Sequence, residues 1–177
     1  EAKLVRPLNL QSPAIVVPNG VNMDEVEPLP PLGQFRQRNP QLDSRPFFLF
    51  LGRIHYKKGL DLLADAYAMA VQRNLPADLV VAGPDDGALP DFQQRIANWQ
   101  LNNRVHVVGP IYGPQKFEAL RDATAFVLPS RQEGFSMAIT EALAARVPVI
   151  ITENCHFPQV AQVNAGLVIQ LDIVELA

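Results

Sequence analysis

The sequence predicts an α/β protein built on a doubly wound parallel sheet, and three observations lead to this prediction. Apolar runs of strand length alternate with stretches whose apolar residues have helical spacing. The runs are apolar throughout rather than at every second position, which is typical of parallel strands covered on both faces. Glycine and charged residues follow most of the runs, and a doubly wound fold binds its ligands beyond the carboxyl ends of its strands.

About six strands are expected after residue 46, at 47–51, 79–82, 105–108, 124–128, 147–151 and 167–169. Helices are expected between them, because apolar residues recur there every three or four positions. The residues that form these patterns are Leu60, Leu63, Ala64, Tyr67, Ala68 and Val71, then Phe92, Ile96 and Trp99, then Phe117 and Leu120 after Pro114. A further helix is expected to begin near Ser136, which can act as its N-cap. Residues 172–177 also have a helical pattern.

The chain is expected to divide near residue 46. Residues 14–17 are an apolar run of strand length, closed by a Pro-Asn-Gly turn signal. Residues 21–46 are rich in Pro, Gln, Arg and Asn and have no period, which favours an irregular connection. Residues 1–46 are therefore assigned to an N-terminal strand and a linker segment, and residues 47–177 to a Rossmann-like domain. Because the chain lacks an initial methionine and stops within a helical pattern, we expect a fragment truncated at the C-terminal end of this domain.

Composition excludes several classes of protein. The 177 residues are 48% hydrophobic and 19% charged with a formal net charge of -3, which argues against a nucleic-acid partner. Cys155 is the only cysteine, so no intrachain disulfide forms, and no Cys and His have metal-ligand spacing. No apolar run approaches the roughly 20 residues of a membrane span. We expect a cytoplasmic protein with no metal site.

The segment after the first strand contains the clearest candidate site. Gly52 is followed by Arg53 and Lys58, and a guanidinium beside an ammonium suits the oxygens of a diphosphate. Two cations in an arbitrary loop are more often simply solvated, but the flanking glycines and the following helix favour the clamp here. His55 is expected to lie on the surface without a catalytic role.

The next strand end gives a weaker signal. Gly83 would allow a ligand to approach the backbone, although turn chemistry explains it equally well. Asp85 and Asp86 resemble a metal-binding pair, but adjacent aspartates in a turn are more often solvated. No metal is assigned to them.

The third strand ends in a segment that is compatible with nucleobase binding. Val108, Gly109 and Ile111, with Tyr112, present opened backbone and apolar surface to a flat ring. A packed strand end explains the same residues about as well. His106 is expected to be a sheet residue rather than a ligand.

After the fourth strand, a loop is expected to run into a helix. Glu133 lies in this loop, and the amides of Gly134, Phe135 and Ser136 precede the helix, whose free N-terminal donors attract an anion. Glu141 follows Glu133 by eight residues, inside the helix. A phosphate would fit at the start of the helix.

The two glutamates allow more than one interpretation. A glycoside hydrolase uses two carboxylates as acid and base or nucleophile, but this would leave Arg53 and Lys58 unexplained. Carboxylates also bind vicinal hydroxyls through two hydrogen bonds, so one could hold a ribose and the other a sugar. After the fifth strand, Cys155 and His156 are adjacent in sequence, and because adjacent side chains seldom face each other, they are not assigned as nucleophile and base.

Four stretches together resemble a known family: FLGRIHYKKGLDLL, VVAGP, VHVVGPI and VLPSRQEGFSMAITEALAARVPVI. They are similar to the C-terminal, donor-binding half of retaining glycosyltransferases of family 4 (glycosyl transferases group 1), which have the two-domain GT-B fold. The resemblance runs from about residue 18 to residue 169, and PNGVN at 18–22 resembles the interdomain segment of the family. Its most specific part is the pair of glutamates separated by seven residues.

The resemblance implies a role for each matching position. Arg53 and Lys58 would bind the donor's diphosphate and stabilise the leaving nucleotide, and Glu133 would contact the transferred sugar. Glu141 would hold the ribose, and residues 107–112 would meet the base. The donor would be a UDP-, GDP- or ADP-sugar, with no metal or other cofactor, because cationic side chains and the helix dipole replace the cation.

The resemblance has limits. Many relatives have a Gly-Gly pair where this chain has CHFPQV, so no substrate role is assigned to Cys155 or His156. The N-terminal acceptor domain of the family is missing, and any peripheral membrane contact would belong to that half, so the fragment alone is expected to be inactive. A non-catalytic sugar-nucleotide-binding or interaction module of the same fold is the alternative. A Rossmann oxidoreductase is disfavoured, because Gly-x-Gly-x-x-Gly does not follow the first strand.

Overall fold

A central parallel sheet organises the molecule. The computed structural model describes residues 7, 15, 17, 19–42 and 44–177. Within these residues, six strands pair in the order β3-β2-β1-β4-β5-β6, and every pairing is parallel. The strands are β1 (Phe47–Leu51), β2 (Asp78–Ala82), β3 (Val105–Gly109), β4 (Ala125–Leu128), β5 (Val149–Thr152) and β6 (Gly166–Ile169). The predicted doubly wound sheet is confirmed, and each strand begins and ends within two residues of its predicted bounds.

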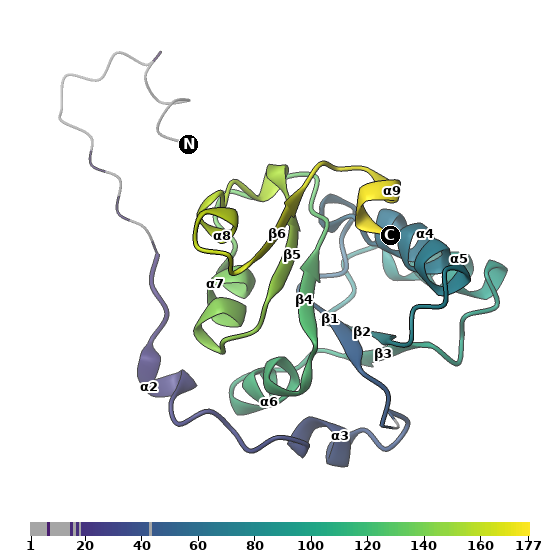
Figure 1. The fold of residues 1–177 in the computed structure, drawn as a ribbon, viewed down its shortest axis with the longest axis horizontal. Coiled ribbons are helices and arrows are strands. Elements are labelled where there is room, and N and C mark those ends of the chain that lie inside the picture. Colours follow the sequence, from purple (N-terminus) through teal and green to yellow (C-terminus); the bar gives the residue numbers. More distant parts are fainter. Residues whose placement is uncertain (1–6, 8–14, 16, 18, 43) are drawn as a thin grey trace.

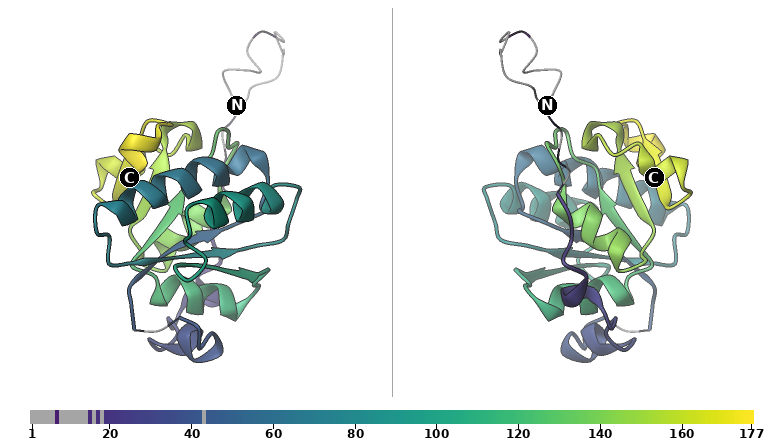
Figure 2. Two further views of the ribbon diagram at one scale, coloured as in Figure 1. Left: turned by 90° about the vertical axis from the view of Figure 1, so that its right-hand side faces the viewer. Right: turned by 90° about the vertical axis from the view of Figure 1, so that its left-hand side faces the viewer.

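Helices cover both faces of the sheet (Figure 1). Helices α4 and α5 lie on one face, with α9 packed beside α4, while α6 and α7 lie on the other (Figure 2). Their bounds, with those of α8, are α4 (Leu60–Gln72), α5 (Leu89–Asn98), α6 (Pro114–Asp122), α7 (Met137–Ala144), α8 (Gln159–Gln162) and α9 (Ile173–Leu176). The helical patterns predicted α4, α5, α6, α7 and α9 but not α8.

The strands form because their residues are apolar on both sides of the backbone. Every residue of β2 and β4 is buried, and β1 has only Phe48 partly exposed. The side chains of Phe47, Leu49 and Phe50 have no solvent-accessible surface in the fold. Burial of one such side chain contributes about 1.5–3 kcal/mol, so the three central strands hold much of the core.

Gly83 joins two strand ends. Its backbone has φ +153°, and a Cβ at this position would lie 1.8 Å from the carbonyl oxygen of Gly52. The amide of Gly83 donates to the carbonyl of Gly109 at 2.9 Å. The backbone of Gly83 therefore lies close to the neighbouring strand ends, and the approach of a ligand to Gly83 stays a prediction.

The segment before β1 is more ordered than its composition indicated. It contains two short helices, α2 (Met23–Val26) and α3 (Gln34–Arg38), which contact α7 and α6 respectively. Phe35 is buried, and its ring lies 6.0 Å from that of Phe47. The carboxylate of Asp122 accepts hydrogen bonds from the amides of Gly33 and Arg36. The expected irregular connection thus contains helices and contributes a side chain to the core.

The strand expected at 14–17 lies largely outside the described residues. Residues 14 and 16 are not described, while Ile15 and Val17 are exposed and not in a strand.

A group of charged side chains fixes the amino-terminal edge of the sheet. Asp78, at the start of β2, is 2% exposed and accepts from Arg104 at 2.7 Å. His106 Nε2 lies 3.1 Å from the second oxygen of the same carboxylate. His106 is therefore a residue of β3 that contacts the buried Asp78 carboxylate, and the sequence had indicated a sheet residue.

Candidate functional site

The loops after β1 and β4 meet at the carboxyl edge of the sheet. β1 and β4 are neighbours in the sheet although they are distant in the chain, and the strand order reverses between them. Ligands of doubly wound folds bind at such a reversal. A cleft of about 430 Å³ opens there. It is lined by Arg53, His55, Lys57, Lys58, Gln132, Glu133, Gly134 and His156.

The centre of the cleft is an ion pair between the two loops. Lys58 Nζ donates to Glu133 Oε1 at 2.6 Å, and the two side chains are 20% and 8% exposed. The hydroxyl of Ser130, which is fully buried, donates to the same carboxylate oxygen. The amide of Glu133 donates to the carbonyl of Asn154 at 3.1 Å. Glu133 is therefore held on both its side chain and its backbone.

Arg53 lies at the rim of the cleft. Its Nη1 is 2.6 Å from Asp86 Oδ2, and its side chain is 67% exposed. An exposed pair of this kind contributes little to stability, so the guanidinium can exchange a carboxylate for a stronger anionic ligand at small cost. Asp85 instead accepts from the amides of Gly87 and Leu89 at the start of α5.

The loop after β1 turns tightly so that Lys58 points into the cleft. His55 Nδ1 accepts from the amide of Lys57 at 3.1 Å and caps the short helical turn Tyr56–Lys58. Gly59 ends this turn with φ +72°, and α4 begins at Leu60. His55 thus has a structural role while it also lines the cleft.

Glu141 has a partner that the sequence did not indicate. Lys116 Nζ, from the first turn of α6, donates to Glu141 Oε1 at 2.7 Å, and both side chains are more than four-fifths buried. Glu141 does not belong to the described lining of the cleft. Lys116 follows the candidate base-binding segment 107–112 by only four residues, and this proximity was the one available signal.

The residues before α7 differ in exposure. Ser136 is the N-cap by backbone conformation and is 4% exposed, but its side chain does not cap the first turn. Phe135 is 36% exposed, and its ring lies 5.7 Å from that of Phe157. Of the three residues predicted to offer backbone amides, Gly134 belongs to the described lining of the cleft, whereas Phe135 and Ser136 do not.

The other predicted residues lie at neighbouring strand ends. Val108 and Ile111 are partly buried and pack against the core, whereas Tyr112 is 69% exposed. The amide of Gly52 donates to Ala82 and continues the ladder between β1 and β2. The described cleft brings together Arg53, Lys58, Glu133 and Gly134, but does not extend to Gly52, Gly83, Val108, Gly109 or Ile111.

Cys155 and His156 face different surroundings. Burial raises the pKa of the Cys155 thiol, which lies 3.5 Å from the carbonyl oxygen of Leu128. His156 is exposed, has φ +52° and lines the cleft. The buried, protonated thiol is not suited to act as a nucleophile.

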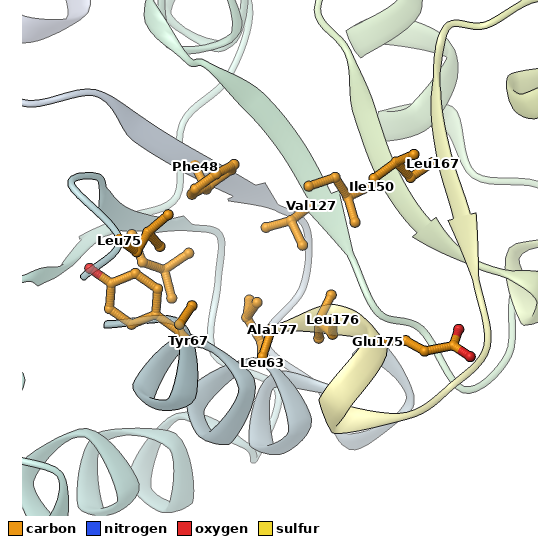
Figure 3. Close-up of a pocket in the computed structure, with 12 residues that line it drawn as sticks. Phe48, Leu63, Tyr67, Leu75, Val127, Ile150, Leu167, Glu175, Leu176 and Ala177 are labelled. Atoms are coloured by element: carbon orange, nitrogen blue, oxygen red, sulfur yellow. The ribbon is translucent and has the colours of Figure 1, made fainter. Parts of the chain in front are cut away.

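An apolar hollow of about 250 Å³ lies elsewhere, between the sheet and α4 and α9. Side chains of five strands line the hollow, and Val127 and Ile150 point toward Leu63 and Leu176 (Figure 3). Glu175 points away from the other side chains, and its carboxylate accepts from the amide of Gln170. The hollow lacks converging polar groups, so the cleft is the better candidate for a charged ligand.

The described residues contain neither a cluster of metal-binding side chains nor a helix able to span a membrane. No group of three or more His, Cys, Asp or Glu side chains is placed to hold a metal ion. None of the helices in that part of the chain combines the length and apolar character needed to cross a bilayer.

Comparison with known proteins identifies the family. A model of the family described as glycosyl transferases group 1 matches residues 45–177. The chain belongs to this family. The phosphatidyl-myo-inositol mannosyltransferase of Mycobacterium leprae is 29% identical over 153 residues, covering 85% of this chain and 38% of that protein.

Solved glycosyltransferase structures have the same fold. The C-terminal domain of the glycosyl transferase group 1 protein LpcC from Francisella tularensis matches with a TM-score of 0.73 at 20% identity, covering 85% of this chain and 80% of that one. Anabaena Alr3699/HepE in complex with UDP and glucose matches with a TM-score of 0.76 at 20% identity, covering 90% and 44%. The glycosyltransferase domain described here is thus one Rossmann-like half of a GT-B fold. It spans about a third of the length of the curated relatives it matches.

Proposed function

We propose that this glycosyltransferase domain binds the nucleotide-diphosphate-sugar donor of a retaining glycosyltransferase. The observation that carries the proposal is the cleft where the β1 and β4 loops meet. Its described lining has three Lys or Arg side chains, Arg53, Lys57 and Lys58, against one carboxylate, Glu133. An anion is the ligand that such a lining favours. Family membership and the UDP found in a structural relative support a nucleotide as that anion.

The residues of the cleft have separate tasks in this proposal. An ammonium has three donors, and Glu133 occupies one donor of Lys58, so Lys58 retains donors for the diphosphate oxygens. Arg53 would exchange Asp86 for a phosphate. Glu133 keeps a second oxygen for the hydroxyls of the transferred sugar. Glu141, held by Lys116, would accept from the ribose hydroxyls.

During transfer, the bond between the anomeric carbon and the diphosphate breaks, and negative charge develops on the leaving group. Preformed cations facing that position stabilise the transition state more than the ground state, because the leaving group carries more negative charge in the transition state than in the bound donor. Lys58 and Arg53 perform this task without a metal ion. The acceptor would be bound by a second domain, so this chain alone binds donor and transfers nothing.

Calorimetric titration of the 177-residue chain with UDP, GDP and ADP, with EDTA present, tests the proposal. Saturable binding of at least one diphosphate is expected, and the preferred one names the nucleobase. If none of the three binds at millimolar concentration, the donor-site assignment is wrong.

A further inference from the structure

Arg131 joins the two loops that form the cleft. It lies two residues before Glu133, in the loop between β4 and α7. Its Nη1 and Nη2 donate to the two carboxylate oxygens of Asp61, each at 2.7 Å. Nη1 also donates to the carbonyl of Tyr56 at 3.0 Å, and the guanidinium carbon lies 4.1 Å from the centre of the Tyr56 ring. The amide of Arg131 donates to the carbonyl of Lys57 at 2.7 Å.

Both partners of the ion pair are charged and largely buried. The side chains of Arg131 and Asp61 are 20% and 21% exposed. Burial raises the pKa of Asp61, but the hydrogen bond and charge of Arg131, together with backbone hydrogen bonds at Leu62 and Asp61, outweigh it, so the pKa lies below its ordinary value. The hydrogen bond to Asp61 is the main reason that the pKa of Arg131 is raised. Both side chains are therefore charged near neutral pH, and the ion pair is formed.

The contacts of Arg131 are made beside the cleft, next to the two residues that form its central ion pair. Arg131 does not line the described cleft, and its guanidinium donates instead to Asp61 and to the carbonyl of Tyr56. Arg131 contacts Tyr56 and Lys57, the two residues that precede Lys58 in the chain. Arg131 itself lies two residues before Glu133. Every contact of the guanidinium thus links the loop after β4 to the segment 56–61 after β1.

We propose that Arg131 is a positioning residue that holds the loops of Lys58 and Glu133 at the spacing needed to bind a nucleoside diphosphate. The identity of the ligand rests on the proposed function, whereas the coupling of the loops rests on the contacts alone. Only a planar fork can bind both oxygens of Asp61 while it covers the Tyr56 ring. A lysine at this position would keep the charge and lose that geometry.

Three variants test the proposal against a matched control. Arg131→Lys keeps the charge, Arg131→Gln removes it, and Asp61→Asn weakens the pair from the other side without changing its shape. Arg95→Lys is the control, because Arg95 also binds two carboxylates, of Asp65 at 2.8 Å and Asp91 at 2.9 Å, does not line the described cleft, and keeps its positive charge when replaced by lysine. Circular dichroism and thermal unfolding identify the variants that remain folded.

The first measurement is titration with UDP, GDP and ADP, followed by uridine, guanosine or adenosine to match the diphosphate that binds. Arg131→Lys should weaken diphosphate binding about tenfold, since a displaced charged hydrogen bond has that effect or more. Nucleoside binding should change less than diphosphate binding. Arg95→Lys should bind like the unchanged protein. Binding of the diphosphate by Arg131→Lys within about twofold of the unchanged protein would overturn the proposal.

The second measurement needs no ligand. Hydrogen exchange of residues 53–58 and 130–134 should become faster together in Arg131→Lys and in Asp61→Asn, and should stay unchanged in Arg95→Lys. Exchange that is unchanged in both loops would show that Arg131 does not couple them. If the unchanged protein binds no diphosphate, the proposed function fails, and the exchange measurement still decides the coupling.

Discussion

Lys58 and Glu133 illustrate how a single pair can serve both the fold and a ligand. Glu133 is 8% exposed, and a carboxylate at this depth is costly unless it is paired and hydrogen-bonded. Lys58 and Ser130 meet that requirement. The pair would therefore exist without a ligand, and a diphosphate would find its cation already oriented.

Replacing Lys58 should separate the contributions of phosphate and nucleoside. Lys58→Ala removes a charged donor, so binding of the nucleoside diphosphate should weaken about tenfold or more. Binding of the matching nucleoside should change much less, because the base and ribose would be held elsewhere. Parallel calorimetric titrations measure both.

Lys116→Ala is the matched comparison, because Lys116 forms an ion pair of similar length with Glu141. If Glu141 holds the ribose, this variant should weaken the diphosphate and the nucleoside by the same factor. Equal losses for both ligands in Lys58→Ala would contradict the phosphate assignment.

Tyr67 gives a stability prediction that does not depend on any ligand. Its hydroxyl lies within hydrogen-bond distance of two carbonyl oxygens, those of Ala77 and Arg104, to which it can donate. Burial raises the pKa of Tyr67 from 10.0 to about 12. Between these values the folded protein keeps a proton that the unfolded chain has lost. The free energy of unfolding should therefore fall as the pH rises from about 10 to about 12, by about 2–3 kcal/mol in total.

Urea unfolding at pH 8, 10 and 11 measures this slope, and Tyr67→Phe removes it. Tyr67→Phe should also lose about 1–2 kcal/mol at pH 8, because its hydrogen bond is lost. Tyr112→Phe, at a side chain that is 69% exposed, should leave stability unchanged. A slope that is the same in Tyr67→Phe as in the unchanged protein would exclude Tyr67 as its source.

The accuracy of the sequence prediction differed among elements for physical reasons. The strands could be predicted because they are apolar on both faces, and α4 because thirteen residues give several turns of helical spacing. α3 and α8 have five and four residues, and each buries a single side chain, Phe35 and Val160 respectively, so neither has an apolar period. α3 is held instead by Phe35 and by the distant carboxylate of Asp122.

The turn at Gly59 links an element boundary to the cleft. A Cβ at Gly59 would lie 2.1 Å from the carbonyl oxygen of Pro129, where the Glu133 loop begins, and φ is +72°. Gly59→Ala should cost about 1–2 kcal/mol for the left-handed backbone, and about 1–3 kcal/mol more because Pro129 must move. Urea unfolding of the variant measures the sum.

Gly87→Ala is the control for the backbone cost alone. Gly87 has φ +90°, and no described atom lies within 4 Å of a Cβ placed there. The two variants should therefore differ by the cost of moving Pro129. Equal destabilisation would mean that the loop yields freely at Pro129.

The order of strands in the sheet explains why part of the candidate site could be predicted from the sequence. Lys58 and Glu133 are 75 residues apart, and they meet because β1 and β4 are adjacent and parallel, so their carboxyl ends share an edge. The sheet order supplies that contact once the fold class is known. The link between Arg131 and Asp61 depends on the path of a loop and the start of a helix, which strand order does not determine. Lys116 was missed for the same reason.

Binding at the cleft should stabilise the entire domain, because its residues come from both halves of the sheet. A ligand that binds only the folded state adds RT ln(1 + [L]/Kd), about 2.7 kcal/mol when its concentration is a hundred times Kd. For a domain of this size the melting temperature should rise by about 5–11 °C. Thermal unfolding at increasing concentrations of the diphosphate that binds measures the rise.

The rise should be the same with and without EDTA, since the proposed site uses Arg53 and Lys58 in place of a metal ion. Lys58→Ala should need about tenfold more ligand for the same rise. A rise that disappears with EDTA would mean that the diphosphate binds as a metal complex, because the protein's cations alone would then be insufficient. A rise that is unchanged in Lys58→Ala would place the diphosphate away from the β1 and β4 loops.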